Sequence, residues 1–361
     1  MSFSPEQDAA LKSVDRWLKA GEAPVFRLFG YAGAGKTTLA RHIAENAGGE
    51  VAFAAFTGKA AHVMRQKGCP GATTIHALIY RPADEGEEGE LVFALRRDAP
   101  ASKADLIIID ECSMVDADLG RDLLSFGKPV LVLGDPAQLP PVKGGGFFTE
   151  AAPDVMLTEI HRQAADNPII RLSMDIREGR EPDSAGEGLA FLSRRDIAPE
   201  AILGADQVLV GVNRTRRRFN ARIRELKGHK DPLPEAGEKL VCLRNNKQKG
   251  LLNGGLWTVT QKKPQKAGRA RMAVMPEDGG KPATIAVPAD FFTLGPEAVP
   301  FPLRRGADEF DYGYALTVHK AQGSQWDHVV LFDESYAFRD HRARWLYTGV
   351  TRAAARLTIV R

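Results

Sequence analysis

The sequence has few cysteines and no long apolar run, and each shortage excludes a class of protein. Its three cysteines, Cys69, Cys112 and Cys242, lie far apart without C-x-x-C spacing, so neither a disulfide framework nor a structural zinc site is predicted. No apolar run approaches the roughly 18 residues of a membrane span, and the first residues lack the basic and apolar blocks of a secretory signal. We therefore expect a cytoplasmic protein with reduced thiols and no membrane partner.

Excess charge of one sign is also scarce. The net charge of the 361 residues is +3, which by itself says little about a polyanionic partner. Arginines nevertheless crowd one predicted helix within residues 213–226, and two interpretations of them stay open: a surface that neutralises nucleic-acid phosphates, or a solvated basic face. These arginines are Arg214, Arg216, Arg217, Arg218, Arg222 and Arg224.

The stretch "FGYAGAGKTT", residues 29–38, contains a complete phosphate-binding loop. Gly30, Gly35, Lys36 and Thr37 fill the fixed positions of G-x-x-x-x-G-K-[ST]. An apolar run (24–29) precedes it and a helical pattern follows it, so the loop lies between a buried strand and a helix. The free N–H groups and the dipole of the helix N-terminus favour bound phosphate. The sequence therefore predicts binding of a nucleoside triphosphate.

Short apolar runs alternate with helical stretches along most of the chain, which predicts an α/β fold with parallel sheets covered on both faces. The runs form two sets, residues 24–29, 51–56, 106–110 and 129–135, and then 207–212, 314–318, 328–332 and 357–360. Only the first set contains a phosphate loop, so we expect two α/β units with the nucleotide between them. Two stretches break the pattern: a short hairpin at 81–97, and β-like runs from about 238 to 303 that predict a small inserted β-barrel.

Polar residues follow two of the predicted strands. Asp110 and Glu111 end the run 106–110, and Gln138 follows the run 129–135. Ligands of open α/β sheets bind at the carboxyl ends of strands. One carboxylate there is suited to hold Mg²⁺ together with Thr37, the other to orient the attacking water, and Gln138 to sense the γ-phosphate.

The ordered motifs resemble those of superfamily 1 helicases. They are "GYAGAGKTT", "FTGKAA", "TTIHALI", "DECSMV", "GDPAQLPPV", "EIHRQ", "YALTVHKAQGSQW" and "YTGVTRA". This version is similar to the RecD-like and Dda-like branch, superfamily 1B, whose members move 5′ to 3′ along single-stranded DNA. The resemblance implies two RecA-like P-loop domains in tandem, ATP and Mg²⁺ as cofactors, and single-stranded or tailed duplex DNA as partner. A monomer is sufficient for such a motor.

The resemblance also implies domain limits. Domain 1A would span 1–152, with the hairpin insertion 1B at about 81–100 in the position of a strand-separating pin. Domain 2A would span 153–361, interrupted at about 238–303 by an SH3-like domain 2B.

Roles in ATP binding and hydrolysis carry over from the family by position. Lys36 and Thr37 would bind phosphate and metal, Asp110 the metal, Glu111 the water, Gln138 the γ-phosphate and Gln7 the adenine. Arg162 and Arg352 would reach the phosphates from the second domain, so that closure of the cleft drives movement. The full nucleotide set is Gln7, Gly30, Ala32, Gly33, Ala34, Gly35, Lys36, Thr37, Thr38, Gln138, Arg162, Gly323, Gln325 and Arg352.

The implied DNA track consists of Phe56, Thr57, Lys59, Thr74, His76, Thr317, His319 and Lys320. Hydroxyl groups and lysines suit contact with the phosphate backbone without reading the bases. Phe56 and Trp326 offer stacking faces, and core packing is an equal alternative for each. Phe56 and Gln325 depart from the family, where many relatives have Pro and Glu, and the second change bears on recognition of the ribose.

Other functions stay open at this point. The same motifs fit an ATPase that remodels protein–DNA complexes with little strand separation. A nucleotide-dependent kinase or an AAA-type remodeller is a further alternative, but it leaves "HKAQGSQW" unexplained. A nucleic-acid-binding module with a purely structural nucleotide is another, and the intact Glu111 and Arg352 argue against it. The pathway, whether replication, repair or recombination, and the protein partners are left open as well.

Overall fold

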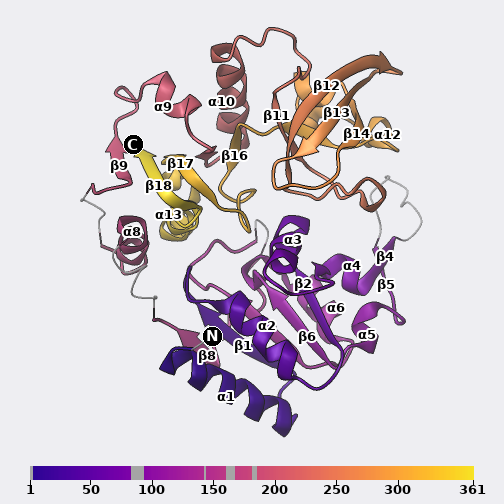
Figure 1. Ribbon diagram of the computed structural model, residues 1–361, viewed down its shortest axis with the longest axis vertical. Helices are drawn as coiled ribbons and strands as arrows, with labels where there is room; N and C mark the ends of the chain where they lie inside the picture. The colour runs from indigo at the N-terminus through magenta and orange to yellow at the C-terminus, as the bar shows by residue number, and fades with distance from the viewer. Residues whose placement is uncertain (1–2, 83–92, 142–143, 160–166, 181–184) are drawn as a thin grey trace. The chain divides into compact units, whose positions relative to one another are not determined.

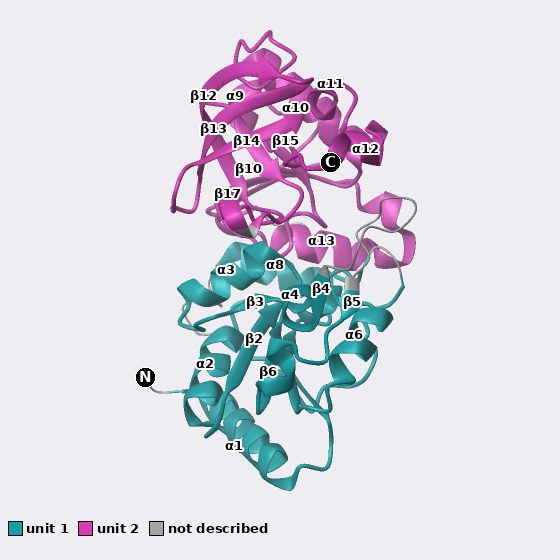
Figure 2. Ribbon diagram, turned by 90° about the vertical axis from the view of Figure 1, so that its right-hand side faces the viewer, with its two compact units in different colours: residues 1–85, 91–181 teal, residues 86–90, 182–361 magenta. Residues whose placement is uncertain are grey.

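The computed structural model describes residues 3–82, 93–141, 144–159, 167–180 and 185–361. The described chain divides into two compact units, one within residues 1–181 and one within 182–361 (Figure 2). Residue 152, where the sequence places the domain boundary, therefore lies inside the first unit, because strand β8 (Val155–Leu157) pairs with β1 (Val25–Gly30). The division into 1A and 2A at that residue stays a prediction about domains.

The first unit contains a six-stranded parallel sheet in the order β3-β2-β6-β7-β1-β8. The sequence pattern explains its position, since neighbouring residues of β1 pack on opposite faces: Phe26 and Leu28 belong to one core, Val25 and Phe29 to the other. The other strands are β2 (Val51–Ala55), β3 (Thr73–Thr74), β6 (Leu106–Asp110) and β7 (Val130–Gly134).

Helices cover both faces of this sheet (Figure 1). Residues of α1 (Pro5–Ala20), α2 (Lys36–Asn46) and α3 (Gly58–Gln66) share one core with the sheet. Residues of α4 (Ile75–Ile79), α5 (Pro100–Lys103) and α6 (Ala117–Leu124) share the other. The short helix η1 (Cys112–Met114) follows β6, and α8 (Pro168–Arg177) ends the unit. Strands β4 (Tyr80–Pro82) and β5 (Phe93–Leu95) pair antiparallel, as a hairpin requires, and the hairpin tip lies outside the described residues.

The second unit contains a five-stranded parallel sheet in the order β16-β10-β17-β18-β9. Its strands are β9 (Leu189–Leu192), β10 (Gln207–Val210), β16 (Ala315–Thr317), β17 (Trp326–Phe332) and β18 (Ala353–Val360). The helices around it are α9 (Pro199–Leu203), α10 (Asn213–Leu226), η4 (Ser335–His341) and α13 (Arg342–Val350).

An antiparallel five-stranded sheet is inserted between α10 and β16, in the order β14-β13-β12-β11-β15. Its strands are β11 (Lys239–Cys242), β12 (Leu256–Lys266), β13 (Arg269–Pro276), β14 (Ala283–Pro288) and β15 (Phe310–Tyr312). Four short helices accompany it: η2 (Lys247–Lys249), α11 (Asp290–Thr293), η3 (Pro296–Ala298) and α12 (Phe301–Arg304). The insertion extends past residue 303, because β15 pairs with β11. Two parallel sheets with this insertion confirm the predicted fold class.

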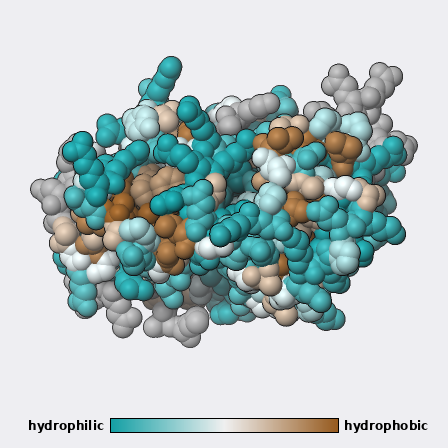
Figure 3. All heavy atoms as spheres, turned by 90° about the horizontal axis from the view of Figure 1, so that it is seen from above, coloured by the Kyte–Doolittle hydropathy of each residue, from teal (hydrophilic) through white to brown (hydrophobic). Residues whose placement is uncertain are grey.

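All three cysteines are buried as free thiols. Among the described residues, no helix is both long and apolar enough to span a bilayer. The face seen from above in Figure 1 is mostly hydrophilic, with separate smaller hydrophobic areas (Figure 3).

Candidate nucleotide and nucleic-acid sites

The phosphate loop joins β1 to α2 as the sequence predicts. Gly35 precedes the first turn of α2 at φ 80°, a left-handed conformation that suits glycine, and it has no side chain to cap the helix. Gly30 lies so close to the end of β8 that an added Cβ would be 2.8 Å from the Leu157 Cβ. The Lys36 Nζ donates to the carbonyls of Gly30 (2.7 Å) and Tyr31 (3.0 Å), which holds its ammonium group over the loop. The loop is therefore shaped to surround an anion.

Asp110 and Thr37 meet at the carboxyl edge of the first sheet. The Thr37 Oγ1 donates to the Asp110 Oδ2 at 3.1 Å, although the residues are far apart in the sequence. Oxygen ligands of this kind fit Mg²⁺, which takes one or two protein groups together with phosphate and water. Glu111 follows at φ 53°, and its N–H donates to the Asp110 Oδ1 at 2.8 Å. A left-handed residue other than glycine stores backbone strain, a feature that clusters at functional sites.

Gln138 lies in the loop after β7, next along the sheet from β6. It is buried, and its N–H donates to the Asp135 carbonyl at 3.1 Å. Its side-chain Oε1 is buried without a hydrogen-bond partner among the described residues. Such an atom is costly unless a ligand or a water satisfies it. The structure thus places an unsatisfied amide oxygen in this loop.

Gln7 connects helix α1 to the phosphate loop. Its Oε1 accepts the Ser4 N–H (3.1 Å), while its Nε2 donates to the Ala34 carbonyl (3.1 Å). Ser4 returns a cap to the Gln7 N–H, which completes a capping box. The Gln7 amide therefore both caps the start of helix α1 and holds the phosphate loop. Its Nε2 has a second N–H that a ligand can accept.

The predicted DNA residues of the first unit also lie at strand ends. Ala55 of β2 is paired in register with Thr74 of β3, so the segments that follow leave the sheet side by side. The hydroxyls of Thr57 and Thr74 accept the N–H groups of Ala60 (3.1 Å) and Ala77 (3.2 Å) as helix N-caps. Each hydroxyl still has its own proton to donate.

Aromatic packing orients the neighbouring predicted residues. His76 lies between rings, with centroids 6.2 Å from Phe56 and 5.6 Å from Tyr80. Burial lowers the pKa of His76, and the weaker attraction of Asp116 opposes this. His76 and Phe56 are both half-buried, as is Lys59. Phe56 therefore serves packing, and whether it also stacks on a base stays a prediction.

In the second unit the predicted DNA residues surround the end of β16. Thr317 is buried, and its hydroxyl accepts the Lys320 N–H at 3.3 Å. His319 is half-buried and lies 5.5 Å from the Phe338 ring. Burial lowers the pKa of His319, and the charge of His341 lowers it further. These groups form one compact turn after a parallel strand.

Arg352 follows α13 and is buried within the second unit. Its guanidinium donates to the carbonyls of Thr348 (3.1 Å) and Ser324 (3.0 Å), and to the Thr351 hydroxyl (3.1 Å). Its link to Ser324 joins it to the turn that contains Gly323 and Gln325. Arg162, the other predicted arginine, lies outside the described residues.

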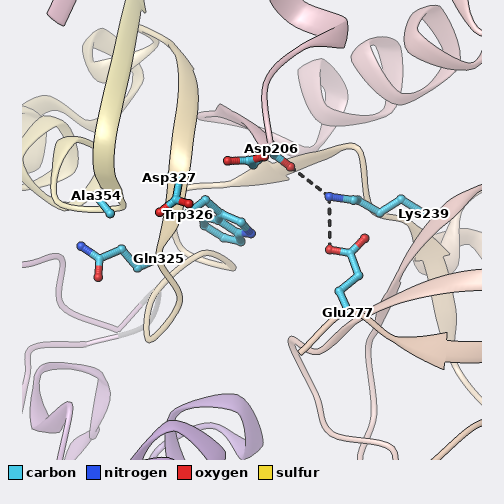
Figure 4. A pocket seen from close by; sticks show the side chains of 7 residues that line it. All are labelled: Asp206, Lys239, Glu277, Gln325, Trp326, Asp327 and Ala354. Carbon is cyan, nitrogen blue, oxygen red and sulfur yellow. Dashed lines mark hydrogen bonds and ion pairs between the residues drawn. The ribbon is translucent and has the colours of Figure 1, made fainter. Parts of the chain in front are cut away.

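Gln325 lines a pocket of about 420 Å³ within the second unit (Figure 4). The indole of Trp326 lies in its wall. On the far side, the Lys239 Nζ contacts the Glu277 carboxylate (3.2 Å) and donates to the Asp206 carbonyl (2.9 Å). Trp326 is thus half-buried at the start of β17, in a setting that combines packing with one accessible face.

The arginines of α10 are mostly engaged in ion pairs. Arg216 is buried and bonds the Asp311 carboxylate at 2.6 Å, and the Arg224 Nε bonds Glu238 at 2.7 Å. Arg217 pairs with Glu297 and Arg222 with Glu225. The remaining two, Arg214 and Arg218, are exposed. Four of the six therefore have carboxylate partners, which supports neither a free phosphate-binding surface nor a merely solvated face.

Comparison with known proteins agrees with this arrangement. A family described as an AAA domain matches residues 2–200, and a UvrD-like helicase C-terminal domain matches 312–360. The ATP-dependent RecD2 DNA helicase of Deinococcus radiodurans is 31% identical over 363 residues, covering 91% of this chain and 46% of that protein. The chain belongs to the superfamily 1B helicases of the RecD and Pif1 type.

Other similar proteins differ more in length or in sequence. The conjugal transfer protein TraA of Rhizobium radiobacter is 27% identical, covering 91% of this chain and 30% of that protein. The chain thus spans less than half of the curated relatives described here. Among solved structures, Bacteroides Pif1 bound to single-stranded DNA has a TM-score of 0.63 at 19% identity, covering 99% and 92% of the two chains. Candida albicans Pif1 has a TM-score of 0.60 at 19% identity, covering 100% and 94%. These likenesses show a shared fold.

Sequence reasoning missed one contact at the helicase phosphate loop. The Arg177 guanidinium at the end of α8 stacks on the Tyr31 ring, with its central carbon 3.4 Å from the ring centroid. Tyr31 occupies a variable position of the loop motif, and Arg177 is distant in sequence. Only a pattern that pairs an aromatic loop residue with a remote arginine would have revealed it.

Proposed function

We propose that this chain is an ATP-dependent 5′-to-3′ translocase on single-stranded DNA and a DNA helicase, in which hydrolysis of ATP drives steps along the strand. The main observation in favour of ATP hydrolysis is the hydrogen bond between Thr37 and Asp110 next to a complete phosphate loop. Membership of superfamily 1B supplies the coupling to DNA.

The first unit supplies the groups for hydrolysis. In the proposed reaction Lys36 turns from the carbonyls of Gly30 and Tyr31 to the terminal phosphates of ATP. Glu111 orients the attacking water, and the amide of Gln138 contacts the γ-phosphate or that water. Thr37 and Asp110 would hold Mg²⁺, which when bound neutralises charge on the phosphates.

Arginines complete the proposed hydrolytic site. Arg162 and Arg352 would stabilise the negative charge of the phosphates in the transition state. An arginine finger typically raises the rate of hydrolysis roughly 10³-fold to 10⁵-fold. Since the Arg352 guanidinium holds three acceptors within its own unit, it must exchange some of them for phosphate oxygens. Hydrolysis is then tied to a change in the second unit.

Both units contribute to the proposed DNA track. The hydroxyls of Thr57 and Thr74, with Lys59 and His76, lie near strand ends of the first sheet, and Thr317, His319 and Lys320 follow β16 of the second. Most of these groups donate hydrogen bonds, which suits phosphate oxygens. Support also comes from relatives: Bacteroides Pif1 was crystallised with ADP-AlF3 and single-stranded DNA, and another structure concerns Pif1 at forked duplexes.

The test compares duplexes with a 5′ tail, a 3′ tail or no tail. We expect ATP-dependent strand separation from the 5′-tailed duplex alone, with Lys36→Ala as the inactive control. Unwinding from the 3′ tail would contradict the polarity. Displacement of a protein block from single-stranded DNA without strand separation would favour the remodelling ATPase instead. ATP turnover that DNA does not stimulate would reject both.

A further inference from the structure

Three neighbouring strands of the second sheet end at one edge. Strands β16, β10 and β17 are adjacent and parallel, and they end at Thr317, Val210 and Phe332. The Val318 N–H donates to the Val210 carbonyl at 3.0 Å. Segments that leave these ends therefore lie next to one another, at the edge where open α/β sheets bind ligands.

A buried carboxylate fixes the segment after β17 to the segment after β10. Glu334 is 4% exposed and accepts the N–H groups of Gly211 (2.7 Å) and Val212 (3.3 Å) and the hydroxyl of Thr215 (2.6 Å). Three hydrogen bonds to one carboxylate hold the start of η4 firmly against the N-terminus of α10. Helix η4 thus begins at a defined position beside the β10 loop.

The two aromatic rings of η4 have different surroundings. Phe338 stacks on Trp345 of α13 at 5.6 Å with an interplanar angle of 17°, and it also contacts His319. Tyr336, two residues earlier, is 68% exposed. The Phe338 ring is therefore anchored beside the proposed DNA residue His319, while the ring of Tyr336 in the same helix is exposed to solvent.

The exposed residues that follow Tyr336 along the chain are mostly basic, and one of them has a strained backbone. Arg339, His341, Arg342 and Arg344 are all exposed, with Asp340 as the one exposed acid within residues 335–344. Arg339 adopts φ 42° and ψ −112°, which interrupts η4. Strain of this kind in a residue other than glycine persists where surrounding structure imposes it, and it clusters at binding sites.

We propose that Tyr336 is a stacking platform for a nucleobase, with the arginines of residues 339–344 contacting the flanking phosphates. This rests on the proposed function, because it extends the DNA track beyond Thr317, His319 and Lys320. A positive surface beside an exposed aromatic ring is the combination that binds single strands without sequence preference. Tyr336 supplies the base contact that hydroxyls and lysines cannot.

The experiment measures the affinity of the full chain for a fluorescent oligothymidylate and for a strand of the same length made of abasic residues. We expect Tyr336→Ala to bind oligothymidylate about 5-fold to 150-fold more weakly, and the abasic strand as tightly as the unaltered chain does. Tyr336→Phe should retain the affinity. Leu303→Ala is the matched control, since Leu303 is 54% exposed in the same unit, and it should change nothing.

Salt dependence separates stacking from charge. Tyr336→Ala should leave the slope of log affinity against log salt unchanged, whereas Arg339→Gln should reduce it by about 0.7 if that arginine contacts one phosphate. Unchanged affinity of Tyr336→Ala for oligothymidylate overturns the inference, and so does an equal loss on the abasic strand. If the unaltered chain binds neither strand, the proposed function itself fails.

Discussion

Replacement of Arg216 should destabilise the second unit far more than replacement of Arg218, an exposed arginine on the same helix α10. Arg216 is 1% exposed and bonds the Asp311 carboxylate at 2.6 Å, and Asp311 is 8% exposed. The Arg216 Nε also donates to Asn213 at 3.2 Å. Arg216→Met leaves the Asp311 carboxylate buried without its partner, which typically costs about 3 to 5 kcal/mol. Arg218 is exposed, so Arg218→Met should lower the free energy of unfolding by less than about 0.5 kcal/mol.

Urea denaturation followed by circular dichroism measures both variants. With a slope of roughly 2 kcal/mol per molar urea, the Arg216→Met midpoint should fall by about 2 M, while that of Arg218→Met should stay near the parent value. Adding Asp311→Asn to Arg216→Met should cost less than the two single changes together, because the stranded charge is then gone. Equal midpoints for Arg216→Met and Arg218→Met would refute the assignment of this arginine to the core.

Three other predictions concern turnover and pH. Lys36→Ala should abolish ATP hydrolysis yet leave much of the single-strand affinity, and complete loss of DNA binding without nucleotide would contradict separate sites. Arg352→Lys keeps the charge but has no fork of donors, so turnover should fall by roughly 10²-fold or more with ATP binding retained; unchanged turnover removes it from catalysis. Burial lowers the pKa of His76 and His319, so the unfolded chain binds protons more readily, and the free energy of unfolding should decrease as pH falls through about 6.5. The double variant His76→Asn/His319→Asn should show a weaker pH dependence of this free energy in urea titrations. An unchanged pH dependence would contradict the reasoning.

Periodicity and motif spacing were enough to predict the two parallel sheets and the inserted antiparallel sheet. Runs such as 106–110 are apolar throughout because both faces of the strand are covered, and that run coincides with β6. The contact of Thr37 with Asp110 also followed from sequence, since carboxyl ends of parallel strands share an edge. Short strands carried too little pattern: β3 has two residues and β8 three, and neither was predicted.

Contacts between remote side chains were beyond the sequence. The α10 arginines left two interpretations open, because two of their carboxylate partners, Asp311 and Glu297, lie in the inserted segment far along the chain. The contact of Arg352 with the Ser324 carbonyl was beyond the sequence for the same reason, since the two residues belong to different parts of the chain. Tyr336 gave no motif at all, and its exposure depends on Glu334 and Phe338 fixing the backbone around it.

The connection from the inserted sheet back to the parallel sheet is very short. Strand β15 ends at Tyr312 and β16 begins at Ala315, while Asn220 of α10 bonds the Tyr312 carbonyl (3.2 Å) and exchanges two bonds with Ala315 (3.2 and 2.8 Å). A shortened chain without the insertion would strip the ionic partners from one side of α10. The outer loops of the inserted sheet can thus be shortened far more easily than the whole insertion can be removed. Any displacement of the inserted sheet will also be transmitted to the turn after Thr317.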